Sequence, residues 1–225
     1  NGFTDKKIAK IKECSEKRNH LFILGDLFDY WVGDDDLDNP LHQRILPALR
    51  NLTYAGAKLS MMRGNRDFLI SERLSELTEA HILPDPFVID LHGKRTLLSH
   101  GDQWCTDDEE YQAIRSIVRT NQWVNDFLEL PIPERHDRAQ GYRQKSNAAK
   151  QTKDAEIMDV SVKTVEDAFK TYNCHRIIHG HTHRHAHHQH LIDAQIRERF
   201  VLSDWSDRGQ ALIFNNSDYS DQFFT

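Results

Sequence analysis

Four short, largely apolar runs in this chain are each followed within two residues by a glycine-containing polar motif, and this pattern constrains the fold more than any other feature. The motifs are Gly25-Asp26, residues 64–67 (GNRD), residues 100–102 (HGD) and residues 179–183 (HGHTH). Short apolar runs that end at turn residues are typical of buried strands. Because side chains at the C-terminal ends of strands gather at one crevice in α/β folds, we expect these polar residues to lie together.

The rest of the pattern alternates helices with strands. Helices are predicted over residues 4–17, 40–54 and 68–78, and the second begins with the capping pair Asn39-Pro40. Strands are expected over 20–25, 58–62, 87–91, 95–99, 175–178, 200–202 and 211–214. The first two strands flank a helix as a βαβ unit, so parallel pairing is expected there, and the third and fourth are expected to form a hairpin.

Residues 108–172 show no strand pattern. Apolar side chains recur there at steps of three and four residues, which predicts helices: Tyr111, Ile114, Ile117, Val118, Phe127 and Leu128. We therefore expect a single domain over residues 1–225 with a helical lid insertion over about 108–172.

Composition limits the functional classes open to the chain. No run approaches the roughly 20 apolar residues of a membrane-spanning helix, and no basic leader with an apolar core opens the chain. Cys14, Cys105 and Cys174 lie far apart, which argues against a disulfide framework or a thiolate zinc site and favours a reducing compartment. A net charge of -6 argues against nucleic acid bound through bulk positive charge.

The four motifs together offer carboxylate, amide oxygen and imidazole, a mixture that suits manganese, iron or zinc rather than calcium. Each motif alone is also compatible with an ordinary turn or a structural histidine, but all four in this order predict a metal centre. Half of the 14 histidines lie between His179 and His190, and in an extended segment residues 179–185 would place alternate histidines on one side. The end of this tract is expected to be a solvent-exposed loop: His185, His187, His188 and His190.

The order GD, GN, H and GHTH resembles the calcineurin-like metallophosphoesterase superfamily. Longer strings resemble its UDP-2,3-diacylglucosamine hydrolase family, with a match from about residue 20 to 205: residues 21–36, 64–69, 99–112, 155–160 and 178–184. The resemblance implies an α/β fold, a sandwich of two mixed β-sheets flanked by helices with a helical lid insertion. It also implies a pyrophosphatase that uses two manganese ions.

The resemblance further implies the metal ligands. Asp26 would bridge both ions, Asn65, His100 and His181 would complete the shell of one, and His183 would bind the other. The family begins with a strand that ends in Asp-x-His and supplies ligands to the second ion, whereas the 25 residues before Asp26 contain no such motif. We therefore expect that the given sequence starts inside the domain and leaves the second site incomplete; the alternative is a degenerate homologue.

The implied reaction is hydrolysis of the pyrophosphate of UDP-2,3-diacylglucosamine to UMP and 2,3-diacylglucosamine 1-phosphate (lipid X) in lipid A biosynthesis. Many superfamily members carry a histidine after the asparagine that helps to protonate the leaving group, but here the residue is Arg66. A guanidinium stays charged, so Arg66 is expected to stabilise phosphate charge, and a phosphate leaving group needs little acid help. A turn arginine on the surface is the alternative. The implied catalytic residues are Asp26, Asn65, Arg66, His100 and His181.

The lid is expected to decide the substrate. Residues 134–153 contain six basic and two acidic side chains, which indicates either an anion-binding surface or a solvated helix face. The resemblance places Ser146, Lys150 and Lys153 against the substrate, with Arg66, Asp108 and Tyr111 opposite, in addition to Asn65 and His181. The apolar residues of the lid would line an acyl chamber or pack on one another.

The implied partners are a lipid-linked UDP-sugar and the surface of the inner membrane, with no nucleic acid, for a monomer attached peripherally to the cytoplasmic face or otherwise cytoplasmic. Two other functions stay open: a nucleotide or phosphodiester hydrolase of the same superfamily, and a non-catalytic binding or scaffold protein.

Overall fold

The first two predicted strands pair in parallel and begin a three-stranded sheet. The structure is a computed structural model that describes residues 2–15, 19–152, 157–205, 209–215 and 218–224. Strands β1 (His20–Leu24), β2 (Lys58–Met62) and β3 (His81–Leu83) lie in this order, all parallel. The βαβ unit predicted from the sequence is confirmed, with the helix and the second strand at the predicted residues.

Three helices cover one face of this sheet: α1 (Gly2–Ser15), α2 (Pro40–Tyr54) and α3 (Glu72–Thr78). Asn39 caps α2 by accepting a hydrogen bond from the Leu41 amide, and Pro40 stands at the first position. The apolar face of α2 is buried, with Ile45, Leu49 and Leu52 at 0% exposure. These side chains pack with Met61 and Leu74 in the larger core of the molecule.

A second sheet has the order β4-β5-β6-β8-β7 and is mixed. Its strands are β4 (Phe87–Leu91), β5 (Lys94–Ser99), β6 (Arg176–His179), β7 (Ala186–Ile192) and β8 (Gln195–Val201). The predicted hairpin is the antiparallel pair β4 and β5. Helix α7 (Val162–Thr171) packs against this sheet through buried residues that include Val165 and Phe169.

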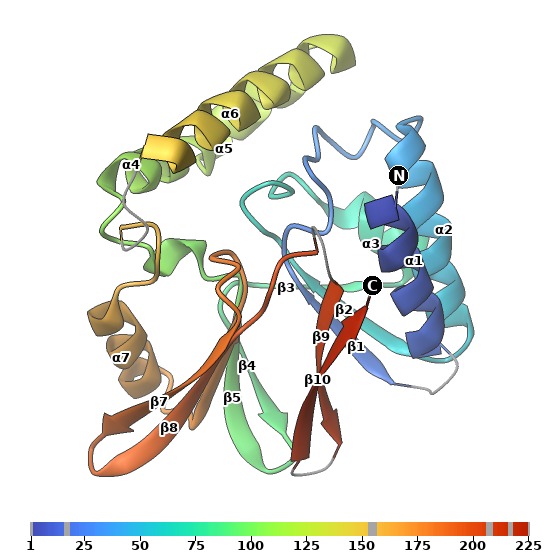
Figure 1. Cartoon of the computed structure of the whole chain (residues 1–225). Coiled ribbons are helices and arrows are strands. Elements are labelled where there is room, and N and C mark those ends of the chain that lie inside the picture. Colours follow the sequence, from blue (N-terminus) through green and yellow to red (C-terminus); the bar gives the residue numbers. More distant parts are fainter. Residues whose placement is uncertain (1, 16–18, 153–156, 206–208, 216–217, 225) are drawn as a thin grey trace.

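The two sheets meet at a small buried cluster that joins β1, β2, β5, β6 and β8: Leu24, Met62, Leu98, Ile178 and Phe200. An antiparallel hairpin of β9 (Gly209–Asn215) and β10 (Asp218–Phe224) packs against it through Leu212 and Phe214. Figure 1 shows the hairpin between the two sheets. The expected α/β sandwich is confirmed; the five-stranded sheet is mixed, whereas the three described strands of the other are parallel.

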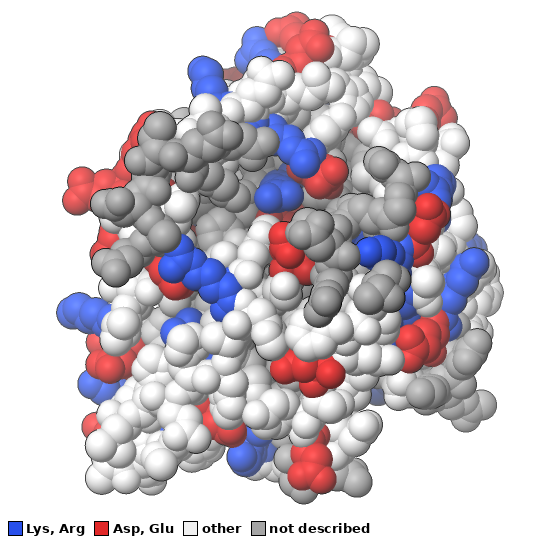
Figure 2. Space-filling model, viewed as in Figure 1, with Lys and Arg blue, Asp and Glu red and all other residues white. Residues whose placement is uncertain are grey.

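The long helical segment between β5 and β6 divides into two parts. Helices α4 (Glu109–Val118), α5 (Asn121–Leu128) and α6 (Ile132–Thr152) lie together at one end of the molecule, while α7 lies apart from them (Figure 1). We call α4 to α6 the lid. Among the described residues, no helix combines the length and apolar character that crossing a membrane requires. On the face in Figure 2, positive and negative side chains are interspersed. A charged ligand that binds this face would therefore be held by individual side chains and not by a broad patch of one charge.

The end of the histidine tract is a strand and not the loop that the sequence predicts, although His185, His187 and His188 are exposed as expected. Residues 186–192 form β7, which pairs in antiparallel fashion with β8 at the edge of the second sheet. The His187 ring stacks on Phe200 with centroids 4.2 Å apart, and its Nε2 lies 3.2 Å from Glu198 Oε1. These partners become neighbours only when β7 pairs with β8, which is why the local pattern did not reveal the strand.

Candidate metal centre

Four predicted ligands come together at the C-terminal ends of four strands. Asp26 follows β1, Asn65 follows β2, His100 follows β5 and His181 follows β6, so each sheet contributes two residues. The Asn65 Oδ1 atom lies 3.0 Å from His100 Nε2 and 2.8 Å from His181 Nδ1. Ligand atoms of Asp26, His100 and His181 all lie within 4.8 Å of one another. The convergence expected from the strand-end motifs is therefore present.

The donor set fits a divalent cation. His100 Nδ1 lies 2.8 Å from the Leu24 carbonyl oxygen and donates its proton there, so the neutral ring would offer the lone pair of Nε2 to a cation. A cation that displaces the Nε2 proton would meet that lone pair, the Asn65 amide oxygen and the Asp26 carboxylate at one point. Nitrogen and oxygen ligands of this mixture suit a borderline cation such as manganese, iron or zinc.

The local charge also attracts a cation. Burial by itself lowers the pKa of His100, but the Asp26 and Asp102 carboxylates outweigh burial and raise it. Burial raises the pKa of Asp26, and the neighbouring His100 and Arg66 lower it below its usual range. Asp26 is therefore a carboxylate, and positive charge beside His100 is favoured.

Two glycines let the first two loops approach each other. Gly25 has φ +88°, and a Cβ there would lie 2.5 Å from His100 Nδ1 and 2.6 Å from Gly64 Cα. A Cβ on Gly64 would overlap the Asp26 backbone nitrogen and Oδ1, and would lie 2.9 Å from its Cγ. Asp26 itself has φ 54°, a left-handed backbone that aspartate adopts more readily than most residues other than glycine. The glycines of the GD and GN motifs are thus required by close packing.

Asp67 joins the same two loops, and sequence reasoning assigned it no role. Its side chain is fully buried and accepts hydrogen bonds from the amides of Asp26 (3.1 Å), Phe28 (3.3 Å) and Gly64 (2.8 Å). Burial and the nearby Asp26 raise the pKa of Asp67. In the sequence, the only indication of this role was the position of Asp67 as the last residue of the GNRD motif.

Arg66 lies at the edge of the centre. Its amide donates to Asp26 Oδ1 at 2.9 Å, and its Nε lies 3.5 Å from Asp26 Oδ2. Its Nη1 lies 3.7 Å from Asp29 Oδ1, and 31% of the side chain is exposed. A fixed positive charge therefore borders the ligand cluster and remains accessible to a bound anion.

A second buried acid, Asp102, connects the centre to the lid. Its carboxylate accepts hydrogen bonds from the Tyr111 hydroxyl and from Arg115 Nε, both at 2.8 Å, and lies 3.7 Å from Arg119 Nη2. The Tyr111 ring lies 5.6 Å from the His181 ring. Burial and Asp102 raise the pKa of Tyr111, so its phenol stays protonated. Asp108, also predicted at the site, caps α4 by accepting from the Tyr111 amide at 3.0 Å.

The other predicted residues lie outside this cluster. His183 Nδ1 lies 3.8 Å from Asp204 Oδ2, and its role at a second ion stays a prediction. Ser146 is exposed on α6. The side chain of Lys150 and all of Lys153 lie outside the described residues.

The histidines after β6 do not alternate on one side. His181 and His183 have φ 64° and 59°, so the segment is not extended as the alternation required. His179 is fully buried and accepts a hydrogen bond on Nε2 from Arg199 Nη1 at 3.1 Å. Burial and Arg199 lower the pKa of His179 to about 3, which keeps its ring neutral. His179 thus packs behind the centre.

Comparison with known proteins agrees with this geometry. The family model described as calcineurin-like phosphoesterase matches residues 2–185. A UDP-2,3-diacylglucosamine hydrolase of Aromatoleum aromaticum is 47% identical over 187 residues, covering 83% of this chain and 76% of the relative. Proteins of the same name are 41% identical over 215 residues in Nitrosococcus oceani (94% and 85% covered) and 40% identical over 200 residues in Bordetella parapertussis (88% and 77% covered).

Proposed function

The chain belongs to the calcineurin-like phosphoesterase family, and from its similarity to UDP-2,3-diacylglucosamine hydrolases we propose that it cleaves the pyrophosphate bond of UDP-2,3-diacylglucosamine. The products are UMP and 2,3-diacylglucosamine 1-phosphate, and the pathway is lipid A biosynthesis. The observation that carries the proposal is the convergence of Asp26, Asn65, His100 and His181 beneath a helical lid.

We assign Asp26, Asn65, His100 and His181 as ligands of manganese, with His183 toward a second manganese ion. When bound, such cations supply positive charge for the phosphate oxygens and lower the pKa of water. The protein contributes the orientation of the ligands. The Leu24 carbonyl holds the His100 ring by its Nδ1, and the amides bound by Asp67 hold the loop of Asp26.

Arg66 contributes a positive charge at the edge of the centre. Its guanidinium lies beside Asp26 at the accessible edge of the centre, where an incoming phosphate would displace part of its contact with Asp29. An arginine stabilises negative charge on a phosphate by donating two parallel hydrogen bonds to its oxygens, but it does not transfer a proton to the leaving group. This suits a reaction whose leaving group is itself a phosphate.

The lid supplies the remaining proposed substrate contacts. Tyr111 and Asp108 lie at the start of α4, and Ser146 and Lys150 lie on α6, with Lys153 following. The protonated Tyr111 hydroxyl is engaged by Asp102, so its proposed role is contact through the ring and not acid catalysis.

The lid also has the surface expected of a peripheral membrane protein. Ile114 and Ile117 of α4 and Tyr142 of α6 are 48%, 58% and 47% exposed, and Arg138 and Lys145 stand four residues before and three after Tyr142 on α6. Apolar side chains with flanking cations favour attachment to an anionic lipid surface. We place the enzyme at the cytoplasmic face of the inner membrane, where an acylated sugar nucleotide would partition.

The test compares two substrates with the purified protein and Mn²⁺. We expect release of UMP from UDP-2,3-diacylglucosamine with a kcat/KM at least about 100-fold above that for bis(4-nitrophenyl) phosphate, which corresponds to about 2.7 kcal/mol of transition-state discrimination. In ¹⁸O-labelled water, the label is expected in UMP, since attack falls on the α-phosphate. Equal rates on both substrates would instead identify a general phosphodiesterase.

A further inference from the structure

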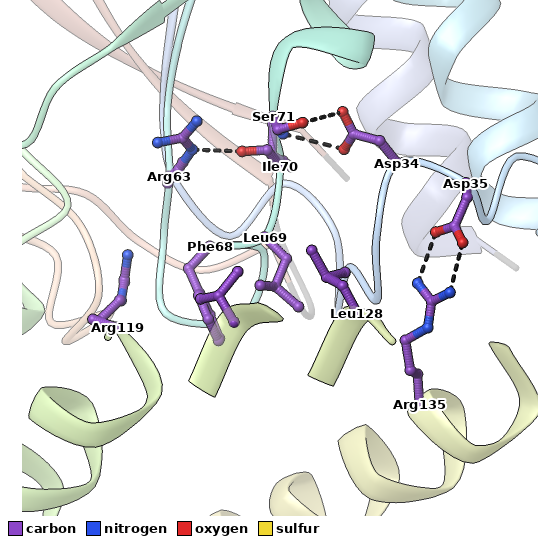
Figure 3. Close-up of a pocket in the computed structure, with 11 residues that line it drawn as sticks. Asp34, Asp35, Arg63, Phe68, Leu69, Ile70, Ser71, Arg119, Leu128 and Arg135 are labelled. Carbon is purple, nitrogen blue, oxygen red and sulfur yellow. Dashed lines mark hydrogen bonds and ion pairs between the residues drawn. The ribbon is translucent and has the colours of Figure 1, made fainter. Parts of the chain in front are cut away.

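The contact between the lid and the body surrounds a cavity. A cavity of about 540 Å³ lies between the lid residues Val124 and Leu128 and the body residues Phe68 and Ile70 (Figure 3). Arg119 borders this cavity and donates to the Gly64 carbonyl oxygen at 3.0 Å, while Arg135 borders it as well. The lid is therefore attached by polar contacts of Arg119 and Arg135 at the border of the cavity and by apolar packing, in which Phe127 of α5 joins the larger core.

Arg135, in the first turn of α6, makes the most complete of these contacts. Its Nη1 and Nη2 donate to the two carboxylate oxygens of Asp35 at 2.7 and 2.5 Å, as drawn in Figure 3. Its Nη1 also donates to the Val32 carbonyl and its Nε to the Leu130 carbonyl, both at 2.8 Å. Only 4% of the side chain is exposed. A guanidinium with this many fixed acceptors has one orientation.

The loop beneath Arg135 is shaped to receive it. Gly33 has φ +140°, and a Cβ there would overlap Arg135 Nη1. The Oδ2 atom of the adjacent Asp36 lies 3.0 Å from His136 Nε2. This acidic loop begins at Asp26, so the same short segment carries a proposed metal ligand at one end and the lid anchor at the other.

The anchor holds the first turn of α6, from which the rest of the helix extends. Ser146 stands eleven residues beyond Arg135, about 16 Å along the helix, so a tilt of about 10° at the anchor would displace Ser146 by about 3 Å. Arg143, between them, pairs with Asp29 at 3.3 Å, but both of these side chains are partly exposed. A displacement of this size is enough to lose productive contact with a substrate.

We propose that Arg135 is a positioning residue that, through Asp35, sets the angle of α6 and thereby the preference for the acylated sugar nucleotide over small phosphate esters. This inference rests on the proposed function. Arg135 does not contact the ligand cluster; it acts through the lid residues expected to contact the substrate.

The experiment measures kcat and KM with Mn²⁺ for UDP-2,3-diacylglucosamine and for bis(4-nitrophenyl) phosphate, a small diester that needs the metal centre but not the lid. Arg135→Lys keeps the charge but loses the paired donors. We expect its kcat/KM for the sugar nucleotide to fall about 10- to 100-fold, mostly through KM, with small-diester hydrolysis within about twofold of wild type. Asp35→Asn is expected to act in the same direction but less strongly, because the bonds to Val32 and Leu130 remain.

Arg138→Lys is the matched control, since Arg138 lies on the same helix and pairs at the surface with Glu134. It should change neither activity by more than about twofold. Equal losses on both substrates for Arg135→Lys, or no loss on either, would overturn the inference; if that variant does not unfold cooperatively, Asp35→Asn decides by the same criterion. A wild-type protein without preference for the sugar nucleotide would refute the proposed function and the inference with it.

Discussion

At the candidate metal centre, contacts between loops from different parts of the chain decide which residue types fit at individual positions. Gly64 lies against Asp26 with no room for a side-chain carbon, and Asp67 ties both loops together through three amides. The sequence indicates neither contact, yet both contacts decide the orientation of the Asp26 carboxylate.

Gly64→Ala tests this packing. The added methyl would overlap the Asp26 backbone and carboxylate, so we expect manganese-dependent hydrolysis to fall at least about 100-fold on both substrates. Gly141→Ala is the control, because nothing lies within 4 Å of a Cβ there and alanine favours a helix by about 0.5–1 kcal/mol. Steady-state kinetics and thermal unfolding compare the pair; full activity of Gly64→Ala would show that the loop moves freely.

His181→Ala tests the proposed ligand set. Removing the imidazole leaves Asn65 Oδ1 without one of its two ring neighbours, and we expect loss of manganese-dependent activity with the fold retained. Activity at wild-type level, with normal circular dichroism, would refute the assignment of His181.

At the scale of elements, the histidine tract has a structural role. His187 stacks on Phe200 of β8, pairs with Glu198, and accepts a hydrogen bond from the Tyr219 hydroxyl of β10 at 3.0 Å. It therefore joins the edge of the second sheet to the C-terminal hairpin. The excess of histidine serves packing in β7 as well as the proposed metal centre.

His187→Ala is expected to lower the free energy of unfolding by about 1–2 kcal/mol, because an aromatic stack and two polar contacts are lost. His188→Ala, on the opposite side of the same strand, should change it by less than about 0.5 kcal/mol; both residues are exposed, so the comparison isolates the contacts of His187. Urea unfolding measures both. Since His187 lies outside the ligand cluster, activity per folded molecule should stay unchanged, and a loss of manganese dependence would contradict the structural role.

At the scale of the whole molecule, the proposed centre joins the two sheets. Asp26 and Asn65 follow strands of the first sheet, and His100 and His181 follow strands of the second. A cation bound by all four would stabilise the arrangement of the sheets, since an unfolded chain does not bring these residues together.

Manganese is therefore expected to raise the melting temperature. At a free concentration of 100 times its Kd, one bound ion adds about 2.7 kcal/mol to the free energy of unfolding, and a chelator should reverse the shift. Differential scanning calorimetry checks this, with His181→Ala as the variant in which the shift is much reduced. An equal shift in that variant would indicate that the cation binds elsewhere.

Local features of the sequence determined much of the fold. Helix α2 and strand β2 lie at the predicted residues, because capping, helical spacing and strand length act over a few neighbouring residues. The pairing of the proposed ligands within each sheet was also predictable, since the ends of neighbouring parallel strands lie at one edge of a sheet. That the two edges face each other was decided by the packing of the sheets on each other.

Only the tertiary structure decided which side chains support the centre and the lid. Asp35 and Arg135 are 100 residues apart in sequence, and β7 acquires its partners only from β8 and β10. The sequence also did not reveal the roles of Asp67 and Asp102. A buried carboxylate and an exposed one in a turn have the same sequence pattern, and only the tertiary structure shows the groups that donate hydrogen bonds to them. Long-range contacts of this kind depend on the packing of the whole chain, which no local pattern contains.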